Sequence, residues 1–192
     1  MTDVKVKVFF SYSHEDEKLR DELAKHLKSL ERQNKIEPWH DRKIVPGTDW
    51  RKELDSQLNS ADIILLLVSP SFVDSDFCYC TELEQARKRH DAGEACIIPV
   101  FLRPLDLEAL EGTPLQTLQG LPEPTNPITT WENRDKAFVE VAQGIRAAVN
   151  KIQQEKEKRQ AAQSRELTRQ SSLRSRVPSE PAQHHARRDP DA

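Results

Sequence analysis

The chain reads Ile63-Ile64-Leu65-Leu66-Leu67-Val68 near its centre, an apolar run with no polar interruption. A half-exposed strand alternates apolar and polar residues, so this run predicts a strand buried on both faces of a parallel sheet. The stretch from Ser69 to Glu84 follows it and carries Glu82 into a predicted helix. Glu82 is therefore expected just past the carboxyl end of the strand, where open α/β sheets place their ligands.

Strand and helix patterns alternate on both sides of this run. Further strands are predicted over 4–11, 36–39, 95–102 and 128–131. Helices are expected after Ser13 and Asp49, over 77–92 and over 135–152, with a short one around 105–110. The helix after Asp49 is expected to turn Trp50, Leu54, Leu58 and Ala61 inward. The order predicts an α/β fold of flavodoxin-like type, with a five-stranded parallel sheet (order 2-1-3-4-5) and helices on both faces.

Length and charge divide the 192 residues into a body and a tail. Residues 1–150 hold 19 basic and 26 acidic side chains, a net charge of −7, whereas residues 151–192 carry a net +4. An acidic body is not expected to bind nucleic acid. The predicted organisation is one domain over 1–152, a polar helical extension over 153–170 and a disordered tail over 171–192.

The sequence also indicates the cellular compartment in which the protein is expected. The longest apolar run is far shorter than the roughly 20 residues that span a bilayer, and the N-terminal stretch reads as a strand rather than a signal peptide, so no membrane contact and a cytoplasmic location are expected. Cys78, Cys80 and Cys96 form no disulfide framework. One residue between Cys78 and Cys80 is not the usual zinc spacing, so no metal site is predicted.

The sequence lacks the motifs that mark several classes of enzyme reaction. The sequence contains no Gly-x-Gly-x-x-Gly, no Walker lysine motif and no nucleophile elbow. A two-component receiver would carry an aspartate at the end of the central strand, but this chain has Val68-Ser69-Pro70 there. We therefore do not expect hydride transfer, nucleotide hydrolysis or α/β-hydrolase chemistry. Nor do we expect the chain to accept a phosphoryl group as a two-component receiver does.

Four sequence blocks together resemble the TIR (Toll/interleukin-1 receptor) domain of the bacterial kind. Their order and spacing carry the resemblance, which covers about residues 4 to 150. The blocks are Phe9-Phe10-Ser11-Tyr12-Ser13-His14-Glu15-Asp16, Trp39-His40-Asp41-Arg42-Lys43-Ile44-Val45-Pro46-Gly47, Ser69 to Leu83, and Phe101-Leu102-Arg103-Pro104.

The resemblance implies self-association through TIR surfaces and, as in many bacterial and plant members, cleavage of NAD at its nicotinamide bond. NAD would be the substrate, with no separate cofactor. The family's catalytic glutamate matches Glu82. Plant-like members show Trp-Cys before it, whereas this chain has Phe77-Cys78-Tyr79-Cys80, so Glu84 stays open as the alternative. The loop from His40 to Gly47 matches the family loop that gates the pocket and takes part in assembly.

Ligand contacts are expected from the end of the first strand and from the gating loop and its flanks. Phe10 could bind the nicotinamide ribose or pack in the core, Trp39 could stack on a base or pack under the loop, and Arg42 could meet the pyrophosphate or face solvent. The predicted substrate-binding residues are Phe10, Ser11, Tyr12, Trp39, Arg42 and Trp50.

Two functions remain open at the level of sequence. One is an NAD glycohydrolase or cyclase that becomes active when TIR domains assemble. The other is a TIR interaction module without enzymatic activity, which would scaffold signalling through homotypic contacts. Glu82 favours the enzyme, because one carboxylate suffices to stabilise the positive charge that builds on the ribose as neutral nicotinamide leaves.

Overall fold

A computed structural model describes residues 4–45, 47, 49–75 and 81–174, with backbone alone for residues 81, 82, 114 and 170–174. The predicted start of the helix over 77–92, the cysteines Cys78 and Cys80, and Pro46 in the gating loop lie outside these residues.

The centre of the fold is a parallel sheet in the order β2-β1-β3-β4. Its strands are β1 (Val6–Ser11), β2 (Ile36–Trp39), β3 (Ile63–Val68) and β4 (Cys96–Phe101). All of β3 is buried, as its unbroken apolar run predicts. Among the described strands β2 pairs with β1 alone and so lies at the edge of the sheet, as the predicted strand order requires; Pro38 within β2 has no N–H and suits an edge position.

The predicted fifth strand is wrong. Ile128 is fully buried, but residues Ile128–Thr130 form a 3-10 helix, η6. Beside β4 the sheet gains a single bridge instead, in which the Leu121 amide donates to the Pro99 carbonyl (2.8 Å) and the Leu121 carbonyl accepts from the Phe101 amide (2.9 Å). Pro122 follows at once and has no N–H to extend a ladder, so the described sheet stays at four strands.

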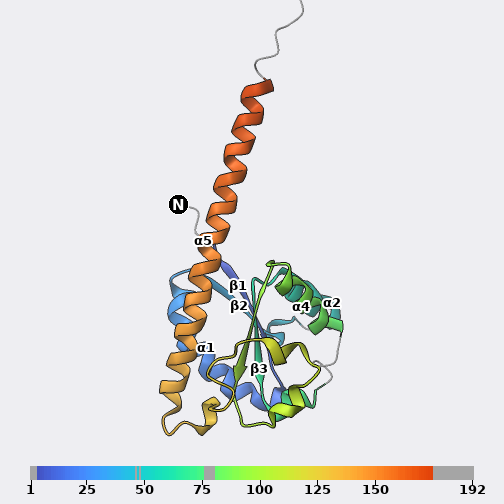
Figure 1. Cartoon of the computed structure of the whole chain (residues 1–192), viewed down its shortest axis with the longest axis vertical. Coiled ribbons are helices and arrows are strands. Elements are labelled where there is room, and N and C mark those ends of the chain that lie inside the picture. The colour runs from blue at the N-terminus through green and yellow to red at the C-terminus, as the bar shows by residue number, and fades with distance from the viewer. Residues whose placement is uncertain (1–3, 46, 48, 76–80, 175–192) are drawn as a thin grey trace, which may run out of the picture. The chain divides into compact units, whose positions relative to one another are not determined.

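Helices cover both faces of the sheet (Figure 1). One core cluster joins α1 and the first part of α5 to side chains such as Phe10 and Leu65, and the other joins α2, α3 and α4 to Phe9 and Leu66. Neighbouring residues of one strand serve opposite faces, as the pleat requires. The helices are α1 (Glu17–Arg32), α2 (Trp50–Ser60), α3 (Pro70–Val73), α4 (Thr81–Asp91) and α5 (Arg134–Arg174).

Local signals explain where several helices begin and end. The Asp49 side chain accepts from the Lys52 amide (3.3 Å) and starts α2, while Gly93 takes a φ of +69° just past α4. The inward face predicted for α2 holds for Leu58 and Ala61, which are buried, but not for Trp50, which is 52% exposed in the first turn.

The chain divides into two compact units, residues 1–156 and 157–192. The first contains the sheet and its helices. Within the second, the described residues continue α5 as far as Arg174.

Candidate functional site

The carboxyl edge of the sheet carries the predicted catalytic residue. α4 begins at Thr81, so Glu82 stands in the first turn of the helix that follows β3 and α3. Leu83 and Ala86 are buried and hold α4 against the second core cluster. A helix N-terminus favours the ionised form of a carboxyl group. The Glu82 side chain lies outside the described structure, whereas the alternative, Glu84, is exposed on the same helix.

Tyr12 joins the end of β1 to the start of the loop from His40 to Gly47, for which a gating role is predicted. Its hydroxyl donates to Asp41 Oδ1 (2.7 Å) and accepts from Arg20 Nη2 (3.3 Å), and the Arg20 guanidinium lies 4.9 Å from the Tyr12 ring centroid. Burial first, and then the hydrogen bond to Asp41, raises the pKa of Tyr12 to about 12. The phenol therefore keeps its proton at neutral pH, and its hydrogen bond holds Asp41 in place.

Arg42 belongs to the same network. Residues Asp41–Lys43 form a 3-10 helix, η2, at the start of the loop. Arg42 pairs with Glu17 through two hydrogen bonds, Nε to Oε1 (2.9 Å) and a terminal nitrogen to Oε2 (3.0 Å), and this pairing raises the pKa of the guanidinium. The pair ties the loop to the first turn of α1. In this conformation Arg42 faces a carboxylate of its own chain.

The other predicted ligand residues do not gather at one place. Phe10 is 3% exposed and packs with α1 and α5, and Ser11 is buried at the end of β1. Trp39 stacks on Phe9 with ring centroids 5.1 Å apart, on the face covered by α2 and α4. Trp50 lies exposed at the start of α2. Within the described part of the chain, Tyr12 and Arg42 are the two predicted ligand residues that side-chain contacts link, through Asp41, Glu17 and Arg20.

A buried carboxylate joins three loops at the carboxyl edge. Asp16, 2% exposed, accepts from the Ser69 hydroxyl and lies 3.0 Å from Arg103 Nε, an ion pair without hydrogen-bond alignment. Ser69 Oγ in turn accepts from the Phe72 amide (3.0 Å) and caps α3. The segments that follow β1, β3 and β4 are thereby fixed to one another at the carboxyl edge of the sheet.

A small cavity and a larger cleft lie on opposite sides of the sheet. A cavity of about 410 Å³ lies between α3 and the segment after β4, lined by Pro70, Val73, Asp74, Leu105, Asp106 and Ala109. A larger cleft of about 1010 Å³ lies between α1 and β2 and includes Phe10 but no other predicted ligand residue.

Neither a metal centre nor a membrane span is found in the described residues. They contain no group of three or more His, Cys, Asp or Glu side chains that could hold a metal ion. Within the same ranges, no helix combines the length and apolar character needed to cross a bilayer.

Sequence reasoning missed Arg20, Asp41 and Glu17, which build the network around Tyr12. Arg20 carried a detectable signal. It precedes Leu23, Leu27 and Leu30 at spacings of three, four and three, so it continues the apolar stripe of α1 and had to be buried. A buried arginine requires partners, and the acidic side chains nearby supply them.

The sequence profile of the TIR domain matches residues 8–143, most of the chain. The chain belongs to the TIR domain family. An uncharacterised Sinorhizobium fredii protein, y4lF, is 47% identical over 145 residues, which are 76% of this chain and 44% of that protein. The 2′ cyclic ADP-D-ribose synthase BtTIR of Bacteroides thetaiotaomicron is 29% identical over 107 residues, 55% of this chain and 36% of that enzyme. This TIR chain thus spans less than half the length of both relatives.

Among solved structures, the chain is similar to a conserved protein from Enterococcus faecalis V583. The two share 12% sequence identity and a TM-score of 0.38, over 73% of this chain and 99% of that one. A likeness this low adds nothing to the TIR assignment, which rests on the sequence match.

Proposed function

We propose that this TIR domain cleaves the bond between nicotinamide and ribose in NAD, with Glu82 as its catalytic residue. One observation carries the proposal: in a chain of the TIR family, a glutamate stands in the first turn of α4, which comes after the central strand β3 and the short helix α3. The similarity to an enzyme named a 2′ cyclic ADP-D-ribose synthase supports it at the level of the family.

The chemistry needs one carboxylate. When the bond from ribose C1′ to the pyridinium nitrogen breaks, both electrons leave with the nitrogen, so nicotinamide departs neutral and positive charge builds on the ribose. An ionised Glu82 would stabilise that charge. Water then adds its hydroxyl at C1′ and releases a proton, giving ADP-ribose; attack by a hydroxyl of the same molecule gives a cyclic ADP-ribose instead.

The gating loop and neighbouring copies complete the proposal. Tyr12 and Asp41 would hold the start of the loop, while substrate contacts would come from the predicted set, with Ser11 and Trp39 among them. Contacts between TIR domains would arrange the loop and raise turnover. The partners we propose are therefore NAD and other TIR domains, in a cytoplasmic signalling or defence role.

The first test compares Glu82→Gln with Glu84→Gln in the purified full-length chain. Nicotinamide release from NAD should fall about a hundredfold or more in Glu82→Gln, because the charge that stabilises the ribose is lost while the side-chain shape is kept. Glu84→Gln, a change on an exposed position of the same helix, should retain wild-type turnover. Thermal unfolding should be unchanged in both variants.

The reverse pattern would move the catalytic role to Glu84. A folded Glu82→Gln protein with full turnover, beside an equally active Glu84→Gln, would remove α4 from the chemistry. Turnover per molecule should also rise with protein concentration, since assembly is proposed to complete the pocket.

The second candidate is a non-enzymatic interaction module, and specific contacts favour it. Trp39 stacks on Phe9 and Arg42 pairs with Glu17, so two groups expected to hold substrate are engaged within the protein. In that case the wild-type chain would self-associate but release no nicotinamide at any concentration.

A further inference from the structure

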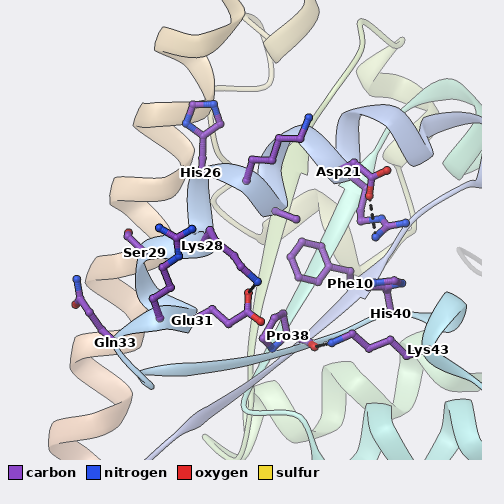
Figure 2. A pocket seen from close by; sticks show the side chains of 14 residues that line it. Phe10, Asp21, His26, Lys28, Ser29, Glu31, Gln33, Pro38, His40 and Lys43 are labelled. Carbon is purple, nitrogen blue, oxygen red and sulfur yellow. Dashed lines mark hydrogen bonds and ion pairs between the residues drawn. The ribbon is translucent and has the colours of Figure 1, made fainter.

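The cleft between α1 and β2 lies on the opposite side of the sheet from α4. Its lining comes from α1, β2 and the residues around η2, with Phe10 of β1 (Figure 2). Phe10 packs in the cluster of α1 and α5, whereas α4 packs in the other cluster. The volume of about 1010 Å³ is at the upper end of the range of small-molecule sites.

The charge of the cleft differs from that of the body. Its lining includes five cationic side chains against two carboxylates, within a body whose net charge is −7. Each carboxylate already has a partner: Asp21 lies 3.0 Å from Arg20, and Glu31 lies 2.7 Å from Lys28.

Three cations of the cleft therefore have no carboxylate to balance them. Lys43 donates to the Pro38 carbonyl, a neutral group, as Figure 2 shows. Lys25 and Arg32 are exposed on α1 and form no hydrogen bond or ion pair with any residue in the described ranges. A concave surface with excess positive charge on an acidic protein concentrates anions.

Two buried nitrogens in the cleft also lack partners. Arg20 is only 5% exposed, and although its terminal nitrogens are paired, its Nε has no acceptor among the described residues. His40 Nδ1 is likewise buried and unpaired within that part of the chain. An unsatisfied buried donor such as Arg20 Nε is destabilising, so an acceptor bound in the cleft would recover free energy.

We infer that this cleft binds a small molecule bearing a phosphate or pyrophosphate group, at a site separate from Glu82. The phosphate oxygens would accept from Arg20 Nε and face the ammonium and guanidinium groups of Lys25, Arg32 and Lys43. Guanidinium and ammonium groups are the usual protein partners of phosphate. Phe10 and the stems of the long side chains would line the apolar remainder.

The test uses inorganic pyrophosphate as probe and titration calorimetry on the full-length chain. We expect saturable binding of one pyrophosphate per chain that weakens as salt is raised. The double variant Lys25→Gln/Arg32→Gln should weaken it about fivefold or more, because two charged contacts are lost. Lys18→Gln removes the same charge from an exposed position of α1 outside the cleft and should bind as the wild type does.

A second readout comes from His40. Burial, then the charges of Arg20 and Lys43, lower its pKa, while Asp41 and Asp21 act in the opposite direction. A bound anion adds negative charge there, so pyrophosphate should raise the His40 pKa measured by NMR, with His40→Gln identifying the signal.

Absence of saturable binding would overturn the inference. So would binding that is equal in the wild type and in Lys25→Gln/Arg32→Gln, since the anion would then occupy another place. Glu82→Gln should leave pyrophosphate binding intact; a loss in that variant would assign the anion to the substrate pocket. Because the readouts are binding and a pKa, a chain without NAD turnover would leave this inference standing.

Discussion

At the scale of single residues, the carboxylate of Asp16 is buried and held by contacts from two other segments of the chain. It is almost fully buried, yet it is paired, because Arg103 lies 3.0 Å away and Ser69 donates to it. Removing one partner of a buried pair leaves the other uncompensated, which costs more than the pair contributes. The contacts of Asp16 with residues more than fifty positions away depend on the fold.

Asp16→Ala is therefore expected to lower the free energy of unfolding by about 2–3 kcal/mol, less than a fully buried pair would lose because Arg103 is one-third exposed. Urea unfolding followed by circular dichroism measures it. Glu15→Ala is the matched control. It removes the neighbouring carboxylate, which is 73% exposed and lies 3.9 Å from Arg103, and should change stability by less than about 0.5 kcal/mol. Equal losses in the two variants would contradict the assigned role of Asp16.

At the scale of elements, the apolar pattern of the sequence correctly predicted the strands that burial alone specifies. The bounds of β2 and β3 are those predicted. Ile36 and the apolar run that starts at Ile63 are buried, and polar or turn residues stand on either side of each segment. The prediction of a strand over 128–131 was wrong for a physical reason. Ile128 is buried as expected, but burial does not specify a strand, and the place beside β4 is taken by a single bridge from Leu121.

The candidate site was predictable only where chain order determines position. Glu82 stands in α4, after the short helix α3, because two adjacent parallel strands such as β3 and β4 need a helical crossover between them. The partners of Tyr12 and Arg42 were not predictable, since Asp41 and Glu17 meet them through side-chain geometry across different elements.

The gating loop gives a prediction at this scale. Gly47 has a φ of +92°, and a side-chain carbon added there would meet no described atom within 4 Å, so Gly47→Val strains the backbone without a steric clash. We expect self-association, measured by light scattering, and NAD turnover to fall together. Gly112→Val is the control, because Gly112 has a φ of +75°, equally open surroundings and a position outside the loop. It should keep both activities.

A Gly47→Val protein that no longer assembles but cleaves NAD at the wild-type rate would separate the loop from catalysis. Loss of both properties in Gly112→Val as well would show that general backbone strain, rather than the loop, is responsible.

At the scale of the whole molecule, the body is tied to α5 where the first unit ends. Lys156 Nζ lies 2.6 Å from Asp62 Oδ2, which also accepts from the Lys7 amide (2.8 Å). Gln153 Nε2 donates to the Val4 carbonyl (3.0 Å). These contacts connect the helix to the amino-terminal ends of β1 and β3, and they lie beyond Ile152, where the apolar stripe of the helix ends.

Ending the chain after Lys156 should therefore leave the thermal midpoint unchanged, whereas ending it after Ile152 should lower the midpoint by roughly 2–4 °C, the equivalent of about 1 kcal/mol from a partly exposed ion pair and one hydrogen bond. Scanning calorimetry on the two shortened chains measures both. Lys156→Ala in the full-length chain should reproduce most of the drop, and Lys158→Ala, on an exposed position of the same helix, should not. A large drop after Lys156 would mean that the second unit stabilises the body. No drop after Ile152 would mean that the contacts of Lys156 and Gln153 are energetically neutral. The apolar stripe of α5 would then supply all of the stabilisation between this helix and the sheet.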